Sequence, residues 1–256
     1  MRFFLPLLFL AAFAKTGLAQ YNPEFATPDD IDPRVTEVYV DVPVVDPGQT
    51  ASDAPADAIV LFDGTNLDAW QRAGDGESAH WTVADGAMTV KSLPYPPGGD
   101  IVTRDSFENF QLHLEFRTPA VVNGEGQGRG NSGVFLQERY EVQILDNYQN
   151  ATYSNGQVGS VYKQTPPLAN PSRGPGEWQT YDILYTAPVF SEKGTLLHPA
   201  YVTVIHNGVV VQNHTAIQGP TNYRGRGIYE PHGALPIKLQ DHGNPMSFRN
   251  IWLREL

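Results

Sequence analysis

From Ile59 to the C-terminus, the chain consists of short segments in which apolar and polar residues alternate, separated by Gly, Asn, Asp and Pro. Alternation with a period of two indicates β-strands that bury one face, and turn residues at this spacing are typical of antiparallel sandwiches. No stretch shows a sustained 3.6-residue period, so helices are expected to be few and short. The sequence therefore predicts an all-β fold, a sandwich of two antiparallel sheets.

Two hairpins can be placed by their turn dipeptides. Asp85-Gly86 separates residues 80–83 from residues 87–90, and Asn207-Gly208 lies between two further strand-like segments. Asp-Gly and Asn-Gly suit two-residue primed turns, in which the central residues adopt positive φ. Each dipeptide is therefore predicted to join two adjacent antiparallel strands.

The first 19 residues are predicted to be an export signal. Arg2 precedes the apolar run Phe3–Phe13, and Gly17 and Ala19 stand where a signal peptidase cuts. The run is too short for the roughly 20 apolar residues of a membrane span, and no later stretch supplies one. A soluble secreted or periplasmic product is expected, beginning near Gln20.

The chain contains no cysteine, which excludes disulfides and a lipid anchor after the signal. Residues 20–57 are rich in Pro and Asp and cannot bury much apolar surface, so they are predicted to be an arm or linker. Within them, the β-prone run Thr36–Val42 is expected to lie along the domain as an extended arm. Residues 58–256 are long enough to form one large sandwich.

The formal net charge of −11 argues against nucleic acid or an anionic membrane as a partner, because both attract clustered Lys and Arg. The Gly-rich run 123–130 could be mistaken for a nucleotide-binding loop, but a β-prone segment follows it, so no helix N-terminus is available for phosphate. The histidines lack metal-ligand spacing. No metal is assigned, and calcium bound by Asp and backbone carbonyl oxygens in the loops stays open.

Side chains alternate faces along a strand, so each segment can be divided into a core face and a polar face. In residues 111–117, Leu112, Leu114 and Phe116 share one side and four polar residues share the other. This second face is expected to meet water.

Two further segments each carry a polar row. Glu141 and Gln143 share one face of residues 140–144, and the row of residues 237–242 is Lys238, Gln240 and His242. If these strands are neighbours, the rows merge into one patch, which is the usual place for sugar on the concave sheet of a jelly roll. The apolar residues expected beneath that patch are Tyr140, Val142, Ile144, Ile237 and Leu239.

Acidic residues near this patch carry the strongest chemical signal. Asp146 would join Glu141 only if a bulge shifted the register. Two close carboxylates can divide the acid and nucleophile roles of glycoside cleavage, because each raises the pKa of the other. The alternative is that all of these are solvated sheet residues.

Aromatic residues in segments rich in Gly, Asn and Pro are candidates to stack on sugar. They are Tyr148, Tyr153, Tyr162 and Trp178. The alternative for Trp178 is that it closes the end of the core, since buried aromatic rings contribute much of a domain's packing.

Several motifs follow one another along the chain: Leu61–Leu67, Gly130–Asp146, Gly176–Asp182, His206–Gly208, Leu239–Gly243 and Phe248–Trp252. In this order and at this spacing they resemble the 3-keto-disaccharide hydrolase family, long catalogued as a domain of unknown function. The resemblance covers about residues 58–256 and implies a concanavalin A-like jelly roll of the lectin/glucanase superfamily, with activity on 3-keto-glycosides.

The related laminarinases carry Glu-x-Asp-x-x-Glu on the matching strand, where this chain has Glu141, Gln143 and Asp146. Gln143 cannot titrate, so an ordinary retaining mechanism is not expected. A 3-keto sugar offers elimination across C1 and C2 instead, which needs a base, an acid and donors to an enolate oxygen. Glu141 and His242 are the candidates for proton transfer. The candidates for substrate binding are Arg129, Asn131, Gln143, Asp146, Tyr162, Lys163, Trp178, Lys238 and Gln240.

Three functions remain open on the sequence. The first is an exported hydrolase or lyase of 3-keto-glycosides, the second a non-catalytic carbohydrate-binding domain, and the third a plain β-glucanase. The first would need an upstream sugar 3-oxidoreductase as a partner, because this chain lacks the nucleotide fingerprint to oxidise a sugar itself.

Overall fold

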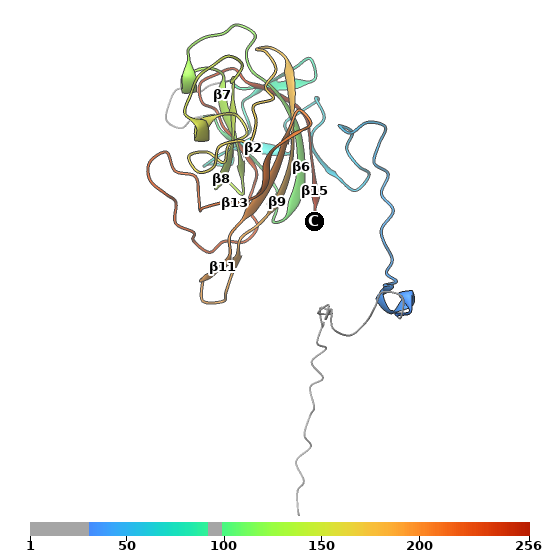
Figure 1. Cartoon of the computed structure of the whole chain (residues 1–256). Coiled ribbons are helices and arrows are strands. Elements are labelled where there is room, and N and C mark those ends of the chain that lie inside the picture. The colour runs from blue at the N-terminus through green and yellow to red at the C-terminus, as the bar shows by residue number, and fades with distance from the viewer. Residues whose placement is uncertain (1–30, 92–98) are drawn as a thin grey trace, which may run out of the picture. The chain divides into compact units, whose positions relative to one another are not determined.

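The computed structural model describes residues 31–91 and 99–256, so the predicted export signal lies outside the described residues (Figure 1). The chain divides into two compact units, one ending at Val44 and the other spanning Val45–Leu256. In the first unit, residues 33–36 form the 3-10 turn η2 (Pro33–Thr36), and the predicted extended run beyond it forms no strand. None of the described helices is long and apolar enough to cross a membrane.

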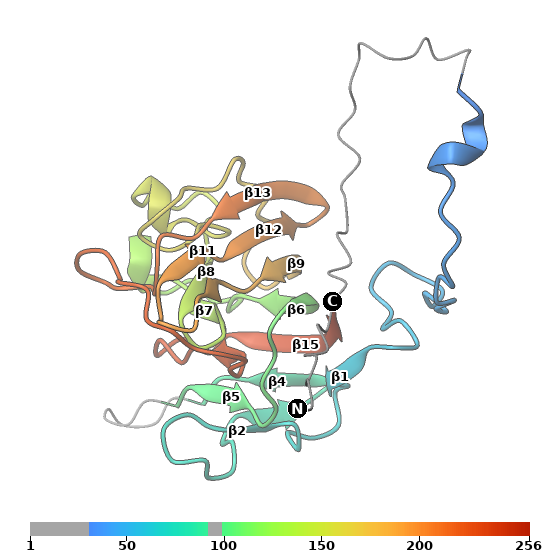
Figure 2. The ribbon, with the colours of Figure 1, turned by 90° about the horizontal axis from the view of Figure 1, so that it is seen from below.

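The second unit confirms the all-β prediction, because it is a sandwich of two antiparallel sheets (Figures 1 and 2). The larger, eight-stranded sheet has the order β13-β12-β9-β6-β15-β4-β3, and β1 also pairs with β15. Its strands are β1 (Ile59–Phe62), β3 (Thr82–Ala84), β4 (Ala87–Thr89), β6 (Phe110–Arg117), β9 (Trp178–Thr186), β12 (Tyr201–His206), β13 (Val209–Ala216) and β15 (Ser247–Glu255).

The smaller sheet has five strands in the order β2-β5-β14-β7-β8. These are β2 (Trp70–Arg72), β5 (Ile101–Thr103), β14 (Lys238–Leu239), β7 (Asn131–Leu136) and β8 (Tyr140–Leu145). The remaining elements are the ribbon β10 (Val189–Phe190) with β11 (Leu196–His198) and the 3-10 turns η3 (Gly126–Gly128) and η4 (Ser154–Gly156). Within the described ranges, the helices are thus few and short, as expected.

Both predicted hairpins are present. Asp85 and Gly86 have φ of 52° and 73° between β3 and β4, and Asn207 and Gly208 have φ of 50° and 79° between β12 and β13. Positive φ at both central residues is the geometry of a type I′ turn, which Asn, Asp and Gly adopt at low cost.

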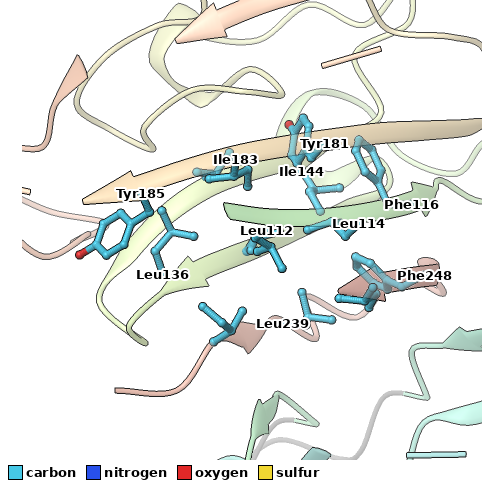
Figure 3. Close-up of a cluster of buried hydrophobic side chains, with 14 of the residues drawn as sticks. Leu112, Leu114, Phe116, Leu136, Ile144, Tyr181, Ile183, Tyr185, Leu239 and Phe248 are labelled. Atoms are coloured by element: carbon cyan, nitrogen blue, oxygen red, sulfur yellow. The ribbon is translucent and has the colours of Figure 1, made fainter. Parts of the chain in front are cut away.

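The core lies between the two sheets (Figure 3). Apolar residues of β6 and β9 in the large sheet face Leu136, Ile144 and Leu239 of the small one, and all of these are buried. Among the polar contacts that cross this core, the hydroxyl of Tyr181 on β9 donates to the carbonyl oxygen of Gln143 on β8 at 2.7 Å. The large sheet therefore helps to hold in place the strand that carries the candidate active site.

The middle of the polar face of β6 is buried, contrary to the prediction that this face meets water, and only the two ends of the strand are partly exposed. His113 is 1% exposed, because it stacks on Trp252 of β15 at 5.1 Å and its Nδ1 lies 2.7 Å from Oδ1 of Asp182. Glu115 is 9% exposed and accepts a hydrogen bond from Nε of Arg249 at 2.7 Å. Long side chains from the neighbouring strands thus cover this face and satisfy its polar groups.

Residues just before β1 add to this cover. The carbonyl oxygen of Ser52 accepts hydrogen bonds from Nδ2 of Asn250 at 2.8 Å and from Nε1 of Trp252 at 3.1 Å. Asp57 pairs with Arg254 at 2.6 Å. Part of the Pro- and Asp-rich segment before residue 58 therefore packs on β15 and belongs to the second unit.

Candidate active site

A hollow of about 280 Å³ opens on the outer face of the five-stranded sheet, and we call it the central hollow. Strands β7 and β8 pair along their whole length, and β14 pairs with β7 on its other side. This order brings the predicted polar rows together, because Glu141 and Gln143 on β8 line the same hollow as Gln240 and His242 after β14. The other lining residues are Asn131, Phe135, Tyr162, Thr221 and Tyr223.

The apolar residues expected beneath the patch are all in the core, each 1% exposed or less: Tyr140, Val142, Ile144, Ile237 and Leu239. Alternation along β8 is thus sufficient to turn the polar side chains of this strand outward. The row after β14 is fixed by backbone contacts, since the N–H of Gln240 donates to the carbonyl oxygen of Gly133 at 3.0 Å.

Glu141 occupies an unusual position in the central hollow. The residue is 4% exposed, yet its carboxylate accepts no hydrogen bond from any residue that the structure describes. Its backbone N–H donates to Oγ1 of Thr221 at 2.9 Å. Gly133 on β7 makes room for the carboxylate, because a Cβ at that position would lie 2.6 Å from Oε1 of Glu141.

Burial raises the pKa of Glu141 to about 8. The nearby ammonium of Lys238 acts in the opposite direction and lowers this pKa, whereas Asp100 raises it. Desolvation dominates because a buried carboxylate without donors loses its hydration and gains little in return. A carboxyl group with a pKa near neutrality is suited to proton transfer.

Amide side chains supply further polar atoms around Glu141. Nε2 of Gln143 donates to Oε1 of Gln127 at 3.0 Å, and Nδ2 of Asn131 donates to the carbonyl oxygen of the same Gln127 at 2.7 Å. Oε1 of Gln143 and Oε1 of Gln240 are buried and find no partner among the described residues. Two acceptors on residues that line the hollow are therefore left to a ligand.

Three predicted site residues lie away from the central hollow. Nε of Arg129 donates to Oδ2 of Asp146 at 2.7 Å, and this ion pair lines a neighbouring hollow. No bulge brings Asp146 beside Glu141, because it follows the end of β8. Trp178 belongs to β9 in the other sheet, where guanidinium groups lie 4.6 Å and 4.2 Å from its ring centroid.

The two predicted lysines do not line the central hollow, although each lies over an aromatic ring that does. Nζ of Lys163 is 3.9 Å from the ring centroid of Tyr153 and 5.1 Å from that of Tyr223. Nζ of Lys238 lies 4.0 Å over the ring of Phe135. Both ammonium groups are thus held by aromatic faces, and Lys238 acts on Glu141 through its charge.

Three lining residues were not predicted: Phe135, Thr221 and Tyr223. Phe135 follows the β7 alternation that also turns Asn131 outward, so face parity could have found it. Tyr223 lies in a segment rich in Gly, Asn and Pro, the signal used for the other aromatic candidates. Thr221 carries no local signal, because its role depends on a contact with β8.

No group of three or more His, Asp or Glu side chains in residues 31–91 and 99–256 is arranged to hold a metal ion. The histidine predicted for proton transfer, His242, is exposed at the rim of the central hollow.

Residues 57–254 match the 3-keto-alpha-glucoside-1,2-lyase-like domain family. The chain belongs to this family. It is 28% identical over 252 residues to a 3-keto-disaccharide hydrolase of Bacteroides thetaiotaomicron, an alignment that covers 79% of this chain and 80% of the relative. Membership makes the sandwich a carbohydrate-active domain, as the motif resemblance indicated.

Solved structures agree with this assignment. A candidate glycosyl hydrolase from Parabacteroides distasonis superimposes with a TM-score of 0.82 at 52% identity, over 88% of this chain and 97% of that one. A second candidate glycosyl hydrolase from the same organism has a TM-score of 0.57 at 20% identity, over 78% of this chain and 94% of the other, and shares the fold.

Proposed function

We propose that this member of the family cleaves the glycosidic bond of 3-keto-glycosides, including 3-keto-disaccharides, in the central hollow. One observation carries the proposal: the buried carboxyl group of Glu141 lines the hollow, has no hydrogen-bond partner among the described residues, and has a pKa raised to about 8. Burying a carboxyl group without hydrogen-bond donors lowers the stability of the folded state. Its presence in the hollow therefore indicates a role in the reaction and not in folding.

The reaction proceeds by elimination and hydration. The ionised carboxylate of Glu141 removes the proton from C2, and the electron pair of that bond moves toward the C3 carbonyl to form an enolate. The enolate collapses to a C1–C2 double bond as the C1–oxygen bond breaks, and the leaving oxygen takes a proton. Water then adds to C1 and a proton returns to C2, so the net reaction is hydrolysis. Release before water adds would make the enzyme a lyase.

The remaining groups of the hollow bind and orient the sugar. The amide oxygens of Gln143 and Gln240 accept hydrogen bonds from sugar hydroxyls, and Asn131 lies beside them. Tyr162 offers a phenol next to Glu141, and the exposed His242 at the rim is placed to protonate the leaving oxygen. These contacts hold C2 against the base, which is the positioning that proton abstraction requires.

A plain β-glucanase mechanism is less compatible with this arrangement. It needs a second carboxylate about 5 to 10 Å from the first. The counterpart on this strand is Gln143, and Asp146 is engaged with Arg129 outside the hollow. Glu141 therefore lacks the acidic partner of an ordinary glycosidase among the residues of β8.

The proposal extends to location and partners. The apolar run after Arg2 fits export to the periplasm or the medium, with cleavage near Ala19. A sugar 3-oxidoreductase acting upstream would supply the keto group, since this reaction consumes an oxidised glycoside and performs no oxidation itself.

The test is incubation of the purified protein with a 3-keto-disaccharide beside its unoxidised parent, with products followed by mass spectrometry. Cleavage of the 3-keto compound alone is expected. Cleavage of the parent alone would contradict the proposal in favour of a β-glucanase, and binding of either sugar without turnover would favour a carbohydrate-binding domain.

A further inference from the structure

A second hollow, of about 440 Å³, lies next to the central hollow and has a different chemical character. Its apolar wall is formed by Pro119, Ala120, Val121, Val122 and Pro245, and we call it the apolar hollow. The side chains of Val121 and Val122 are 82% and 49% exposed. Two adjacent valines exposed at the wall of a hollow offer apolar contact to a ligand.

The two hollows share their boundary. Gly130 lines the apolar hollow and the next residue, Asn131, lines the central one; likewise His242 lines the central hollow and Gly243 the apolar one. The N–H of Asn131 donates to Oδ1 of Asn244 at 2.7 Å across this boundary. Consecutive Cα atoms are about 3.8 Å apart, so a group attached to a sugar in the central hollow can reach the apolar one.

The charged groups of the apolar hollow are already paired with protein groups. Arg129 and Asp146 bind each other, Nη2 of Arg129 donates to the carbonyl oxygen of Tyr148 at 3.0 Å, and the N–H of Tyr148 donates to Oδ1 of Asp146 at 3.2 Å. These contacts leave the apolar wall as the principal surface offered to a ligand.

A third hollow on the opposite side of the central one is polar. It shares Phe135 and Thr221 with the central hollow and is lined also by Glu138, Arg139 and Lys238. An apolar substituent would gain little there, because it would displace water from charged side chains. The chemical difference between the apolar hollow and this polar one therefore indicates on which side of the central hollow an apolar substituent of the sugar binds.

We propose that the apolar hollow is the binding site for an apolar aglycone, the group released from C1, so that the enzyme acts on 3-keto-glycosides of aryl or alkyl alcohols as well as on disaccharides. This proposal rests on the placement of the oxidised sugar in the central hollow by the proposed function. It predicts that selectivity between leaving groups is set by the loop 119–123 and not by the residues around Glu141.

The test compares phenyl and methyl 3-keto-glucosides, as both anomers, with the double variant Val121→Ser, Val122→Ser. The readout is the ratio of kcat/KM for phenyl over methyl, divided by the same ratio for the wild type, which cancels the intrinsic reactivity of the two leaving groups. A fall of about 3- to 10-fold is expected from the loss of apolar contact. Val210→Ser, a similarly exposed valine on β13, is the control and should not change the ratio.

Two results would overturn the aglycone site: an unchanged ratio in the double variant, or a change in that ratio with Glu138→Gln instead, which would place the aglycone in the polar hollow. If neither 3-keto-glucoside is turned over while a 3-keto-disaccharide is, the proposed function stands and the aglycone proposal fails. If the 3-keto-disaccharide is not turned over either, the proposed function fails, and calorimetric titration with the two 3-keto-glucosides tests the apolar hollow separately. Tighter binding of the phenyl compound that the double variant loses would support the site, and equal binding of both compounds would exclude it.

Discussion

The two sheets of the sandwich each bury a glutamate on their outer face, and the two side chains differ in their partners. Glu115 on β6 accepts hydrogen bonds from Nε of Arg249 at 2.7 Å and from Nδ2 of Asn250 at 3.2 Å. Glu141 on β8 is more deeply buried and its carboxylate has no such donor within the described chain. Burial alone thus does not reveal the role of a glutamate. A carboxylate that accepts hydrogen bonds from neighbouring side chains is structural, whereas one without such donors is available for catalysis.

The largest expected contrast is in catalysis. Glu141→Gln should lower kcat on a 3-keto-disaccharide by roughly 10²-fold or more, since it removes the base while keeping the shape of the side chain. Glu115→Gln should leave kcat nearly unchanged, because that side chain lies on the opposite sheet. Near-normal turnover by the Glu141→Gln protein would show that the base lies elsewhere, and His242 would be tested next.

A smaller loss of activity should follow from filling the space beside Glu141. Gly133→Ala places a Cβ where Oε1 of Glu141 now lies, at 2.6 Å, so the carboxylate must move. Because displacement of a catalytic group by about 1 Å can cost up to 10²-fold, we expect kcat to fall about tenfold or more. Gly233→Ala, which meets open space, is the control; equal activity of the two variants would mean that the position of the carboxylate is unimportant.

The two glutamates should also have opposite effects on stability. Glu141 has a pKa of about 8 in the folded protein against an ordinary value of 4.5, so the folded state binds more protons between these values and the free energy of unfolding falls as the pH rises through that window. The Glu141→Gln variant does not titrate at this position and therefore avoids this loss of stability. Its free energy of unfolding should exceed that of the wild type by a few kcal/mol at pH 8 and differ little from it near pH 4.

Glu115→Gln should instead lower the free energy of unfolding by about 1–3 kcal/mol at pH 8, because Arg249 loses a charged partner. Urea unfolding of both variants at pH 4 and pH 8 measures these differences. A Glu141→Gln protein that is less stable than the wild type at pH 8 would contradict the raised pKa.

The smallest expected effect is on the pH profile. If Glu141 is the base, kcat/KM should rise with pH through an inflection near pH 8 and level off above it. Lys238→Met removes the charge that lowers this pKa and should move the inflection to higher pH, whereas Asp100→Asn should move it to lower pH, each by less than about one unit. Shifts of the same sign in the two variants would argue that another group sets the profile.

Local patterns in the sequence were sufficient to predict the strands and the faces of their side chains, but not which residues from other parts of the chain cover those faces. The alternation in residues 140–144 predicted which side chains of β8 face outward, and the dipeptides Asp85-Gly86 and Asn207-Gly208 predicted two hairpins, because both signals depend only on neighbouring residues. The burial of His113 and Glu115 could not be predicted in this way. It depends on side chains of β15 and on the segment around Ser52, which is distant in sequence.

In the candidate active site, too, local patterns predicted some residues and missed those that depend on distant contacts. Face parity brought Glu141, Gln143 and Gln240 together, but it could not show that Thr221 and Tyr223 close the hollow from a loop about 80 residues further along the chain. Nor could it show that Arg129 and Asp146 neutralise each other outside the central hollow. The raised pKa of Glu141 was beyond the sequence for the same reason, because it depends on how strongly the surrounding strands and loops bury the carboxylate.

The position of β15 has a consequence for how the molecule is made. The last strand, Ser247–Glu255, lies in the interior of the large sheet, between β6 on one side and β1 and β4 on the other (Figure 2). The sheet cannot be completed until β15 has been synthesised, because the pairing of β1 with β15 joins strands that are almost 200 residues apart, and such non-local pairing is slow. A growing chain of this topology therefore keeps apolar strand surface unpaired until β15 emerges, and the complete sandwich forms only afterwards.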